Sequence, residues 1–411
     1  MNRVSLSALS AEVRKLQGGG RGKVLLAIAI GWGISVGARM IYPVVLPQLR
    51  EVYALDLVDA GMILTVLFAA YAIGQLPGGI LADRIGERVT LTVSLLLSAS
   101  ALVSIILVRS RTALFVATAL FGFGVGFYAI ARFTAVVALY PRGYGTAAGV
   151  TNSAPAIGQA VLPPIAGSIA VLVGWQYGLG FTIPVFVLVA VALWVTLSKH
   201  ATAGTGAVDT FTRDTVRTLL SALRDPSVVI ATLILILGIF IWQAFTGFYP
   251  TYLIDEKGLS PTVASALFGL HFAGSALVHP LSGMIYDRWN VKYAFPIVAV
   301  AVVMLVGLPF VGSVPALIVV SILLGTLLGF ETATESYLVD ALPSDVEGTG
   351  FGILRTVVFA TGSVSPILFG AVAELGFFDE LFLLLAGVGT LMLAIATRLP
   401  VAQRSSGRTV S

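Results

Sequence analysis

The feature that most constrains the fold is the recurrence of apolar runs about 20 residues long, the length of helix that spans the hydrocarbon core of a bilayer. The stretch Val314–Gly329, VPALIVVSILLGTLLG, contains no charged residue. Inside that core only structures that satisfy their own backbone hydrogen bonds are stable. The whole chain is 57% hydrophobic and 11% charged, whereas soluble domains carry about 25% charged residues. The sequence therefore predicts an all-α integral membrane protein.

Twelve such runs are predicted to be transmembrane helices, numbered here as spans 1 to 12. Their expected ranges are 24–46, 57–81, 89–108, 113–139, 146–173, 179–198, 227–254, 261–285, 293–311, 314–341, 348–374 and 378–397. Residues 199–226 are polar, charged and rich in Gly and Thr, so they are predicted to be a cytoplasmic linker. This linker would join an N-terminal six-helix bundle, 1–198, to a C-terminal six-helix bundle, 227–411.

Lys and Arg are distributed unevenly between the two expected sides of the membrane. With the N-terminus inside, the cytoplasmic segments hold 17 of the 24 basic residues and the external segments hold 4, while three lie inside spans. Cytoplasmic loops carry the excess of positive charge in helical membrane proteins. The sequence therefore predicts a multi-pass protein of the cell membrane with both termini in the cytoplasm.

Three short segments of the first half of the chain recur in the second half, in the same order and at a nearly constant offset in residue number. The matching pairs are Met40–Leu46 with Gly247–Leu253, Gly79–Val89 with Gly283–Tyr293, and Leu139–Gly149 with Ala341–Gly352. Self-similarity of this kind indicates a repeated structural unit. Two related six-helix bundles are expected.

The loop between spans 2 and 3 carries the most specific motif. It reads GILADRIGER from Gly79 to Arg88 and resembles the signature Gly-x-x-x-Asp-Arg-x-Gly-Arg-Arg of the major facilitator superfamily, with Glu87 replacing one basic residue. The second half carries a weaker copy in which Asn290 stands in place of the second glycine. The resemblance implies a secondary transporter of two pseudo-symmetric six-helix bundles that works by alternating access, with this loop as a conformational latch. The expected latch residues are Gly79, Asp83, Arg84, Gly86, Arg88, Asp287 and Arg288. The alternative is an ordinary charged loop that obeys the positive-inside rule.

The same resemblance implies that spans 1, 4, 7 and 10 line a central substrate cavity. Ionisable residues within spans cost roughly 2.5–3.5 kcal/mol on insertion scales, so they are candidates for function. The candidate substrate-binding residues are Arg39, Arg132, Arg355, Tyr128, Trp242, Gln243 and Tyr249. Snorkelling towards the headgroups is the alternative for Arg39, and a structural role is the alternative for Arg132.

Glu331 and Glu335 are the candidate proton-coupling residues. Their i, i+4 spacing places them on one helical face, about 18 and 12 Å inside the end of span 10 at Pro343. The repeat sets Arg132 opposite Thr334 or Glu335 at a matched depth, which predicts a salt bridge between Arg132 and Glu335 that joins the bundles. This pairing leaves the deeper Glu331 as the proton carrier. The alternative is that both carboxylates only neutralise arginines for folding. His271 and His279 of span 8 are expected to be core histidines with satisfied hydrogen bonds.

Several classes of function are excluded by what the sequence lacks. It has no cysteine, no P-loop, no catalytic triad and no metal-ligand constellation, so neither an enzyme nor a cofactor is predicted. The placement of its basic residues fits a membrane better than a nucleic acid. The expected partners are a small-molecule substrate, a coupling proton and the lipid bilayer, and a monomer is expected.

The charges that lie more than three residues from the predicted span ends, three arginines against two glutamates, sum to +1 and favour a small organic anion coupled to protons. One alternative is a drug:proton antiporter that exports hydrophobic or cationic compounds. Gly158-x-x-x-Leu162-Pro163 only half resembles the antiporter signature, because its second glycine is missing. A membrane receptor that does not transport is the other alternative.

Overall fold

The computed structural model describes residues 21–140, 144–197, 221–343 and 347–400, without the side chains of 144–146 and 347–349. In this part of the chain, twelve helical segments are long and apolar enough to cross a membrane, as the sequence predicts. Most of the predicted linker, 199–226, lies outside the described residues. The helices in chain order are α2 (Arg21–Arg39), α3 (Ile41–Tyr53), α4 (Leu57–Ile85), α5 (Glu87–Leu107), α6 (Arg111–Leu139), α7 (Tyr144–Val173), α8 (Trp175–Gly180), α9 (Ile183–Thr196), α11 (Pro226–Asp255), α12 (Pro261–Arg288), η2 (Val291–Ala294), α13 (Phe295–Gly307), η3 (Leu308–Phe310), α14 (Val314–Leu324), η4 (Gly325–Leu328), α15 (Gly329–Ala341), α16 (Glu347–Gly362), α17 (Ser365–Ala373) and α18 (Phe378–Ala396).

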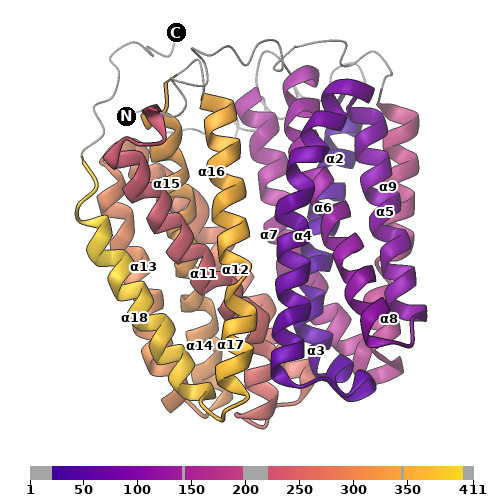
Figure 1. The fold of residues 1–411 in the computed structure, drawn as a ribbon, viewed down its shortest axis with the longest axis vertical. Helices are drawn as coiled ribbons and strands as arrows, with labels where there is room; N and C mark the ends of the chain where they lie inside the picture. The colour runs from indigo at the N-terminus through magenta and orange to yellow at the C-terminus, as the bar shows by residue number, and fades with distance from the viewer. Residues whose placement is uncertain (1–20, 141–143, 198–220, 344–346, 401–411) are drawn as a thin grey trace. The chain divides into compact units, whose positions relative to one another are not determined.

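The chain forms two compact units (Figure 1). Unit 1 comprises the described parts of Met1–Leu55, Ile63–Gly206 and Ser260–Gly269, and unit 2 comprises those of Asp56–Met62, Ala207–Leu259 and Leu270–Ser411. Each unit therefore contains most of one predicted bundle, and the first turns of α4 and α12 are grouped with the other unit. The predicted boundary after residue 198 lies in a segment that the structure does not describe.

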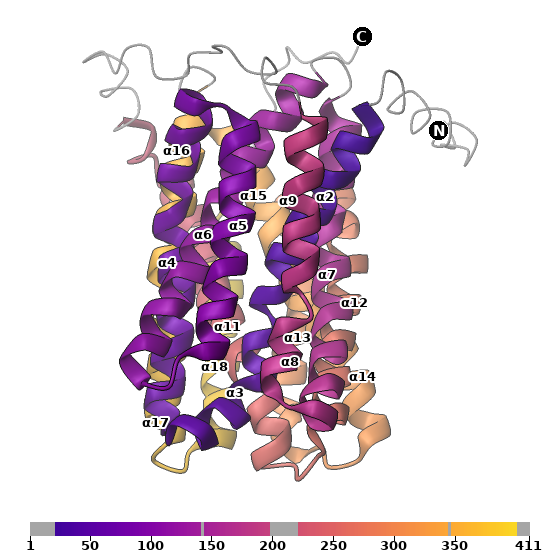
Figure 2. The ribbon, with the colours of Figure 1, turned by 90° about the vertical axis from the view of Figure 1, so that its right-hand side faces the viewer.

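Glycines allow the helices of unit 1 to pack closely. α2 packs along α7, α5 packs along α6, and α9 lies against both α5 and α2 (Figure 2). At the crossing of α2 and α7, a Cβ atom added to Gly158 would lie 2.1 Å from the carbonyl oxygen of Gly33. Without a strong hydrophobic force between helices in lipid, such close approach of small residues is the usual source of helix association.

Span 1 is longer than predicted and is broken in the middle. It runs from Arg21 to Tyr53 rather than ending at residue 46, because helix α3 continues past Pro47. The break falls at Met40 between α2 and α3. Pro43 lacks the backbone N–H that would continue the helical hydrogen bonding, which explains a break at this point. The break leaves Arg39 as the last residue of α2.

In unit 2, α11 is the central helix and packs against α15, α16 and α18, and α13 packs along α18. Span 10 is also discontinuous, because the 3₁₀ turn η4 separates α14 from α15. A 3₁₀ stretch within a helix often marks a hinge or a functional position. Here the chain passes very close to α12, since a Cβ atom at Gly325 would lie 2.5 Å from the carbonyl oxygen of His271.

The internal repeat is visible in side-chain contacts. In unit 1 the hydroxyl of Tyr42 hydrogen-bonds that of Thr118 at 3.1 Å, and in unit 2 the hydroxyl of Tyr249 hydrogen-bonds that of Ser321 at 2.7 Å. All four side chains are fully buried. Each bond joins the first span of its unit to the fourth, and the two tyrosines are those of the repeated Tyr-Pro motif. The two units are therefore built to one plan.

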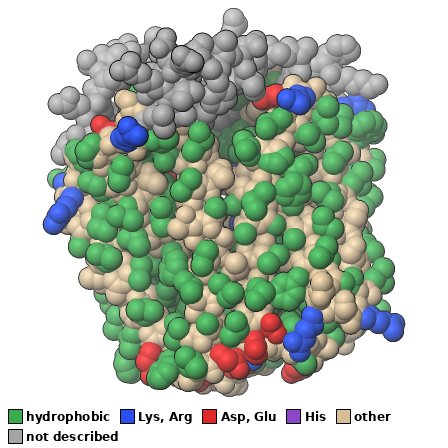
Figure 3. Space-filling model, in the orientation of Figure 1, with side chains coloured by type: hydrophobic (Ala, Val, Ile, Leu, Met, Phe, Trp, Pro, Cys, Tyr) green, Lys and Arg blue, Asp and Glu red, His purple; other side chains and the backbone are tan. Residues whose placement is uncertain are grey.

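On the face that Figure 3 shows, apolar side chains are spread over the middle of the helices, and charged side chains are seen mainly towards their ends. Among the most exposed apolar side chains are Leu172, at 80%, and Val195, at 75%. This arrangement would be unfavourable in water, but it is the one that a hydrocarbon solvent requires.

Candidate functional site

Arg132 of α6 is the centre of a polar and aromatic cluster in unit 1. Its side chain is only 4% exposed, and its Nη1 donates a hydrogen bond of 2.8 Å to Oδ1 of Asn152 on α7. Its guanidinium lies 4.5 Å from the ring centroid of Trp32 and 4.1 Å from that of Phe133. Trp32 in turn stacks on Tyr128. Three helices thus hold the guanidinium in place, which makes a charge tolerable inside an apolar unit.

Arg39 is buried in unit 1 as well, at 3% exposure. Its guanidinium lies over two aromatic rings of α4, 4.2 Å from the centroid of Tyr71 and 5.5 Å from that of Phe68. Its position at the C-terminal end of α2 favours a positive charge, because the helix dipole is negative there. Snorkelling to the headgroups is therefore not the state of this side chain.

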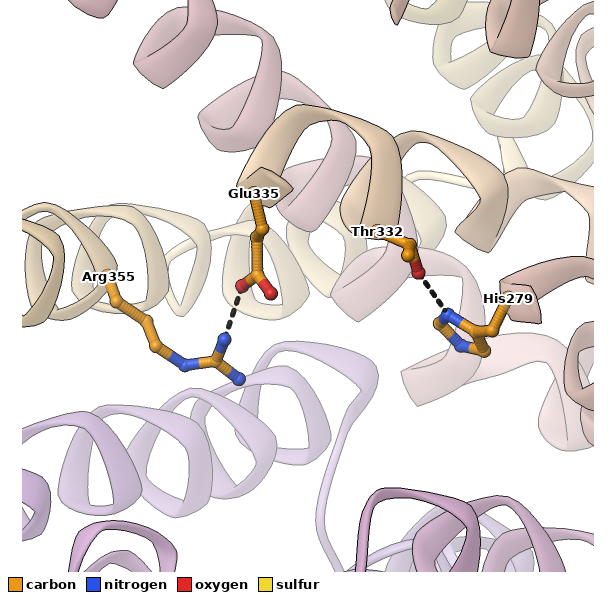
Figure 4. Close-up of polar contacts among 4 residues, drawn as sticks. All are labelled: His279, Thr332, Glu335 and Arg355. Atoms are coloured by element: carbon orange, nitrogen blue, oxygen red, sulfur yellow. Dashed lines mark hydrogen bonds and ion pairs between the residues drawn. The ribbon is translucent and has the colours of Figure 1, made fainter. Parts of the chain in front are cut away.

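In unit 2, Arg355 of α16 forms an ion pair and hydrogen bond with Glu335 of α15 (Figure 4). The two side chains are 22% and 24% exposed. The sequence prediction paired Glu335 with Arg132, but the partner that the structure gives Glu335 comes from its own unit. Depth along a helix had suggested the wrong arginine, since Arg355 lies at a similar depth and on the adjacent helix.

Glu331 shares a recess with this ion pair. The recess lies among α11, α15 and α16, and apart from the three charged residues its lining is apolar. The lining residues are Leu235, Ile239, Glu331, Glu335, Leu338, Phe351, Arg355, Val358 and Phe359. Glu331 is in the first turn of α15, where the positive end of the helix dipole favours a carboxylate.

The other predicted substrate ligands differ in their burial and in their hydrogen bonds. The hydroxyl of Tyr128 donates to the carbonyl of Ile28 at 3.0 Å, and that of Tyr249 is bonded within unit 2, so both join helices. Trp242 is 5% exposed on α11. Gln243 is fully buried on the same helix, and neither atom of its side-chain amide has a hydrogen-bond partner among the described residues.

The two histidines of α12 have different environments. Nδ1 of His279 is hydrogen-bonded to Oγ1 of Thr332 at 2.8 Å (Figure 4), as predicted for a satisfied core histidine. The prediction is wrong for His271, because no hydrogen-bond partner is found for either ring nitrogen within the described parts of the chain. Its ring packs instead against Phe245 and Phe272, with centroids 5.0 Å apart in each case.

The structure explains the glycine pattern of the predicted latch. Gly86 separates α4 from α5 with φ 87° and ψ 153°, a conformation that is essentially restricted to glycine. In the second copy Asn290 has φ −174°, an extended backbone that any residue adopts, so no glycine is required. A Cβ atom at Gly79 would lie 3.1 Å from Ile130, and Arg88 stacks on Trp194 at 4.2 Å.

Two of the remaining latch residues, Asp83 and Arg84, are exposed at the end of α4. Asp287 and Arg288 are exposed at the corresponding end of α12. Glu87, which departs from the signature, is 4% exposed and begins α5, where a carboxylate is favourable.

Sequence reasoning missed the residues that hold the arginines. Trp32, Phe133 and the rings of α4 were not identified, because single aromatic residues in an apolar span more often serve packing. A signal for Trp32 was present, since it stands between Gly31 and Gly33, where its ring has room beside a neighbouring helix. Asn152, which is now seen to accept a hydrogen bond from Arg132, was not identified either.

The chain has two repeated six-span halves, charged side chains inside its units and a glycine-dependent loop between spans 2 and 3. Together these features are typical of a polytopic membrane transporter. The sequence profile of the Major Facilitator Superfamily matches residues 28–366 and 240–410. The chain belongs to this superfamily. It is therefore a secondary transporter of a small molecule rather than an enzyme.

Three relatives match nearly the whole chain. The hexuronate transporter of Bacillus subtilis (strain 168) is 24% identical over 89% of this chain and 91% of its own. The probable sulfoacetate transporter SauU of Cupriavidus necator is 26% identical, and the probable galactarate/D-glucarate transporter GarP of Escherichia coli (strain K12) is 25% identical. Both matches cover 90% of this chain and 92% of the relative.

Two solved structures support the fold alone. A point mutant of the nucleoside transporter NupG has a TM-score of 0.78 and 14% sequence identity, over 92% of this chain and 99% of that chain. A bacterial homologue of the human lysosomal transporter Spinster has a TM-score of 0.73 and 15% identity, over 93% of this chain and 95% of that chain.

Proposed function

We propose that the protein transports a small organic anion together with protons. The observation that carries this proposal is the burial of two guanidinium groups, those of Arg39 and Arg132, within unit 1. In unit 2 the charge of Arg355 is paired with that of Glu335. The other charges that lie more than three residues from the predicted span ends are these two arginines and Glu331. A positive balance in a medium of low dielectric constant attracts an anion strongly.

The names of the relatives support the same class of substrate. Hexuronate, sulfoacetate, galactarate and D-glucarate all carry carboxylate groups that are ionised at neutral pH. Guanidinium groups bind carboxylates through paired, charge-assisted hydrogen bonds. In this proposal the arginines within the spans bind the oxygens of the substrate, the aromatic rings around Arg39 and Arg132 fix the orientation of these two side chains, and a carboxylate of α15 takes up the coupling proton.

The proposal is tested by uptake into proteoliposomes under an inward proton gradient, with labelled glucuronate, galactarate and sulfoacetate. We expect uptake of at least one of them by the wild-type protein. Arg39→Ala should reduce it about tenfold or more, because a hydrogen bond to a charged group contributes roughly 1.5–3 kcal/mol. Arg109→Ala is the matched control, since Arg109 is exposed before α6 and should transport normally. Unchanged uptake by Arg39→Ala would remove the argument from the buried arginines.

Export of lipophilic cations is the competing function, and a second assay distinguishes it. It would be indicated if such cations, and none of the anions, raised the unfolding temperature of the purified protein, since a ligand stabilises the state that it binds. We further expect both termini in the cytoplasm, as the distribution of Lys and Arg predicts. Reporter fusions at each terminus test that orientation.

A further inference from the structure

The two units carry the same type of polar clasp at corresponding positions. In unit 1, Arg132 donates to Asn152, and in unit 2, Arg355 donates to Glu335. In both cases the partners are 20 residues apart in the sequence, and the bond joins the fourth span of the unit to the fifth. We define these two contacts as the amide clasp and the carboxylate clasp.

The acceptors of the two clasps differ in chemistry. The side-chain amide of Asn152 is neutral at every physiological pH, whereas the carboxylate of Glu335 can take up a proton and then loses its charge. A proton can therefore weaken the clasp of unit 2, but it has no acceptor to neutralise in the clasp of unit 1. The repeat has placed the proton-sensitive contact in one unit only.

The carboxylate clasp is partly exposed and lines a small recess. Glu335 and Arg355 are about one quarter exposed and line the recess described above, whose walls are otherwise apolar except for Glu331. The ionisable groups around Glu335 are Arg355 on α16, Glu331 on its own helix and His279 on α12. Two other helices that pack on α15, α11 before Asp255 and α13, contain no charged residue. Lys292 in η2 donates to the carbonyl of Thr397.

We propose that the carboxylate clasp is the place where one proton and one substrate carboxylate are taken up together. The inference rests on the proposed function and deepens it. A proton adds to an oxygen of Glu335 and converts the carboxylate to a neutral acid. The guanidinium of Arg355 stays protonated and exchanges its bond to Glu335 for one to the substrate carboxylate. The apolar wall of the recess contacts the carbon skeleton of the substrate.

The charge of the recess is the same before and after this exchange, because a proton and an anionic carboxylate enter together. The step is therefore electroneutral for each carboxylate bound in the recess. It assigns the proton to Glu335 rather than to Glu331, which the sequence alone favoured on grounds of depth.

The test measures proton uptake on binding in detergent, with glucuronate, galactarate and sulfoacetate as probes and a pH-sensitive dye in weakly buffered solution. The wild-type protein should take up one proton for each carboxylate that binds, and its affinity should fall about tenfold for each pH unit above the titration of Glu335. Glu335→Gln gives unit 2 a neutral amide acceptor like that of unit 1. This variant should still bind and exchange substrate, without proton uptake and with an affinity independent of pH.

Glu331→Gln tests the competing carboxylate, one helical turn away in the same recess. Glu256→Gln is the control, because Glu256 is exposed after the end of α11, and this variant should keep the proton uptake of the wild type. Proton uptake that persists in Glu335→Gln, or that disappears only in Glu331→Gln, would overturn the inference. If Glu335→Gln does not fold, Arg355→Lys gives a second test. It should bind the probe more weakly while the proton uptake per bound carboxylate remains, and loss of that coupling would contradict the exchange. Absence of binding and flux in the wild type would instead refute the proposed function.

Discussion

Replacing Gly158 by alanine tests the packing that positions Arg39. Helices α2 and α7 cross at Gly158, and the added Cβ atom would lie 2.1 Å from the carbonyl oxygen of Gly33, well short of the 3.4 Å at which ordinary contact begins. The three nearest atoms all belong to the backbone of Gly33, so no side chain can rotate away. The two helices must move apart by about 1 Å. Gly37, which lies two residues before Arg39, meets Gly158 at the same crossing.

The expected cost is that of an overpacked core, about 1–3 kcal/mol. Alanine also stabilises a helix by up to about 1 kcal/mol relative to glycine, and this gain must be measured separately. Gly149→Ala provides the control, because Gly149 is on the same helix and its Cβ would have no neighbour within 4 Å. Gly149→Ala should leave the unfolding temperature unchanged or raise it slightly.

The assay is thermal unfolding in detergent, followed by tryptophan fluorescence. For a unit of about 200 residues, 1 kcal/mol corresponds to roughly 2–4 °C, so Gly158→Ala should unfold about 5 °C below Gly149→Ala. Anion uptake should fall as well, because Arg39 moves with α2. Equal unfolding temperatures for the two variants would show that the close backbone approach is not present in the protein.

Three further predictions concern contacts that the structure makes specific. Tyr42→Phe should lower the free energy of unfolding by about 1 kcal/mol, because it leaves the buried hydroxyl of Thr118 without its partner. Tyr249→Phe should cost less, since its partner Ser321 also donates to a backbone carbonyl. Chemical unfolding of the two variants compares these costs. Gly86→Ala should cost about 1–3 kcal/mol through strain at its positive φ, seen as a lower unfolding temperature. Asp225→Ala should remove the N-cap of α11, a loss of about 1 kcal/mol. Hydrogen bonds from Ser227 lower the pKa of Asp225, so its contribution is present above the ordinary aspartate range and lost as pH falls through the lowered pKa, and it is measured by unfolding the wild type and the variant across that range.

The number of spans could be predicted from hydropathy, and the repeat could be predicted from the similarity of the two halves of the sequence. A helix that crosses the hydrocarbon core of a bilayer needs a run of roughly 20 apolar residues, and such a run is easily recognised in a hydropathy profile. The repeated Tyr-Pro motif placed Tyr42 and Tyr249 in equivalent positions, and the structure gives them equivalent hydroxyl partners. The motif that starts at Gly79 led to the family, because its residues can be recognised from their spacing in the sequence.

The partner of Glu335 could not be predicted in the same way. Counting residues from the end of a span gives the depth of a side chain, but it does not give the direction in which the side chain leaves its helix. Arg132 and Arg355 lie at comparable depths by that count, so depth could not choose between them. The rotation of each helix about its axis is decided by packing, for example by the contact of Gly238 with the ring of Phe330, and packing was unknown.

Two of the charges within the spans lie beside breaks in their helices. Arg39 ends α2 at the break of span 1, and Glu331 lies in the first turn of α15, just after the 3₁₀ turn of span 10. Each charge has the sign that the adjacent helix end favours, which contributes about 0.3–2 kcal/mol. That contribution is smaller than the roughly 2.5–3.5 kcal/mol cost of a charge in the membrane, so the breaks alone do not account for these residues. The aromatic rings around Arg39 supply part of the difference. A charge that still costs stability after these contributions is expected to persist because it has a function. For Arg39 that function would be the binding of an anion, and in the recess that contains Glu331 it would be the uptake of a proton.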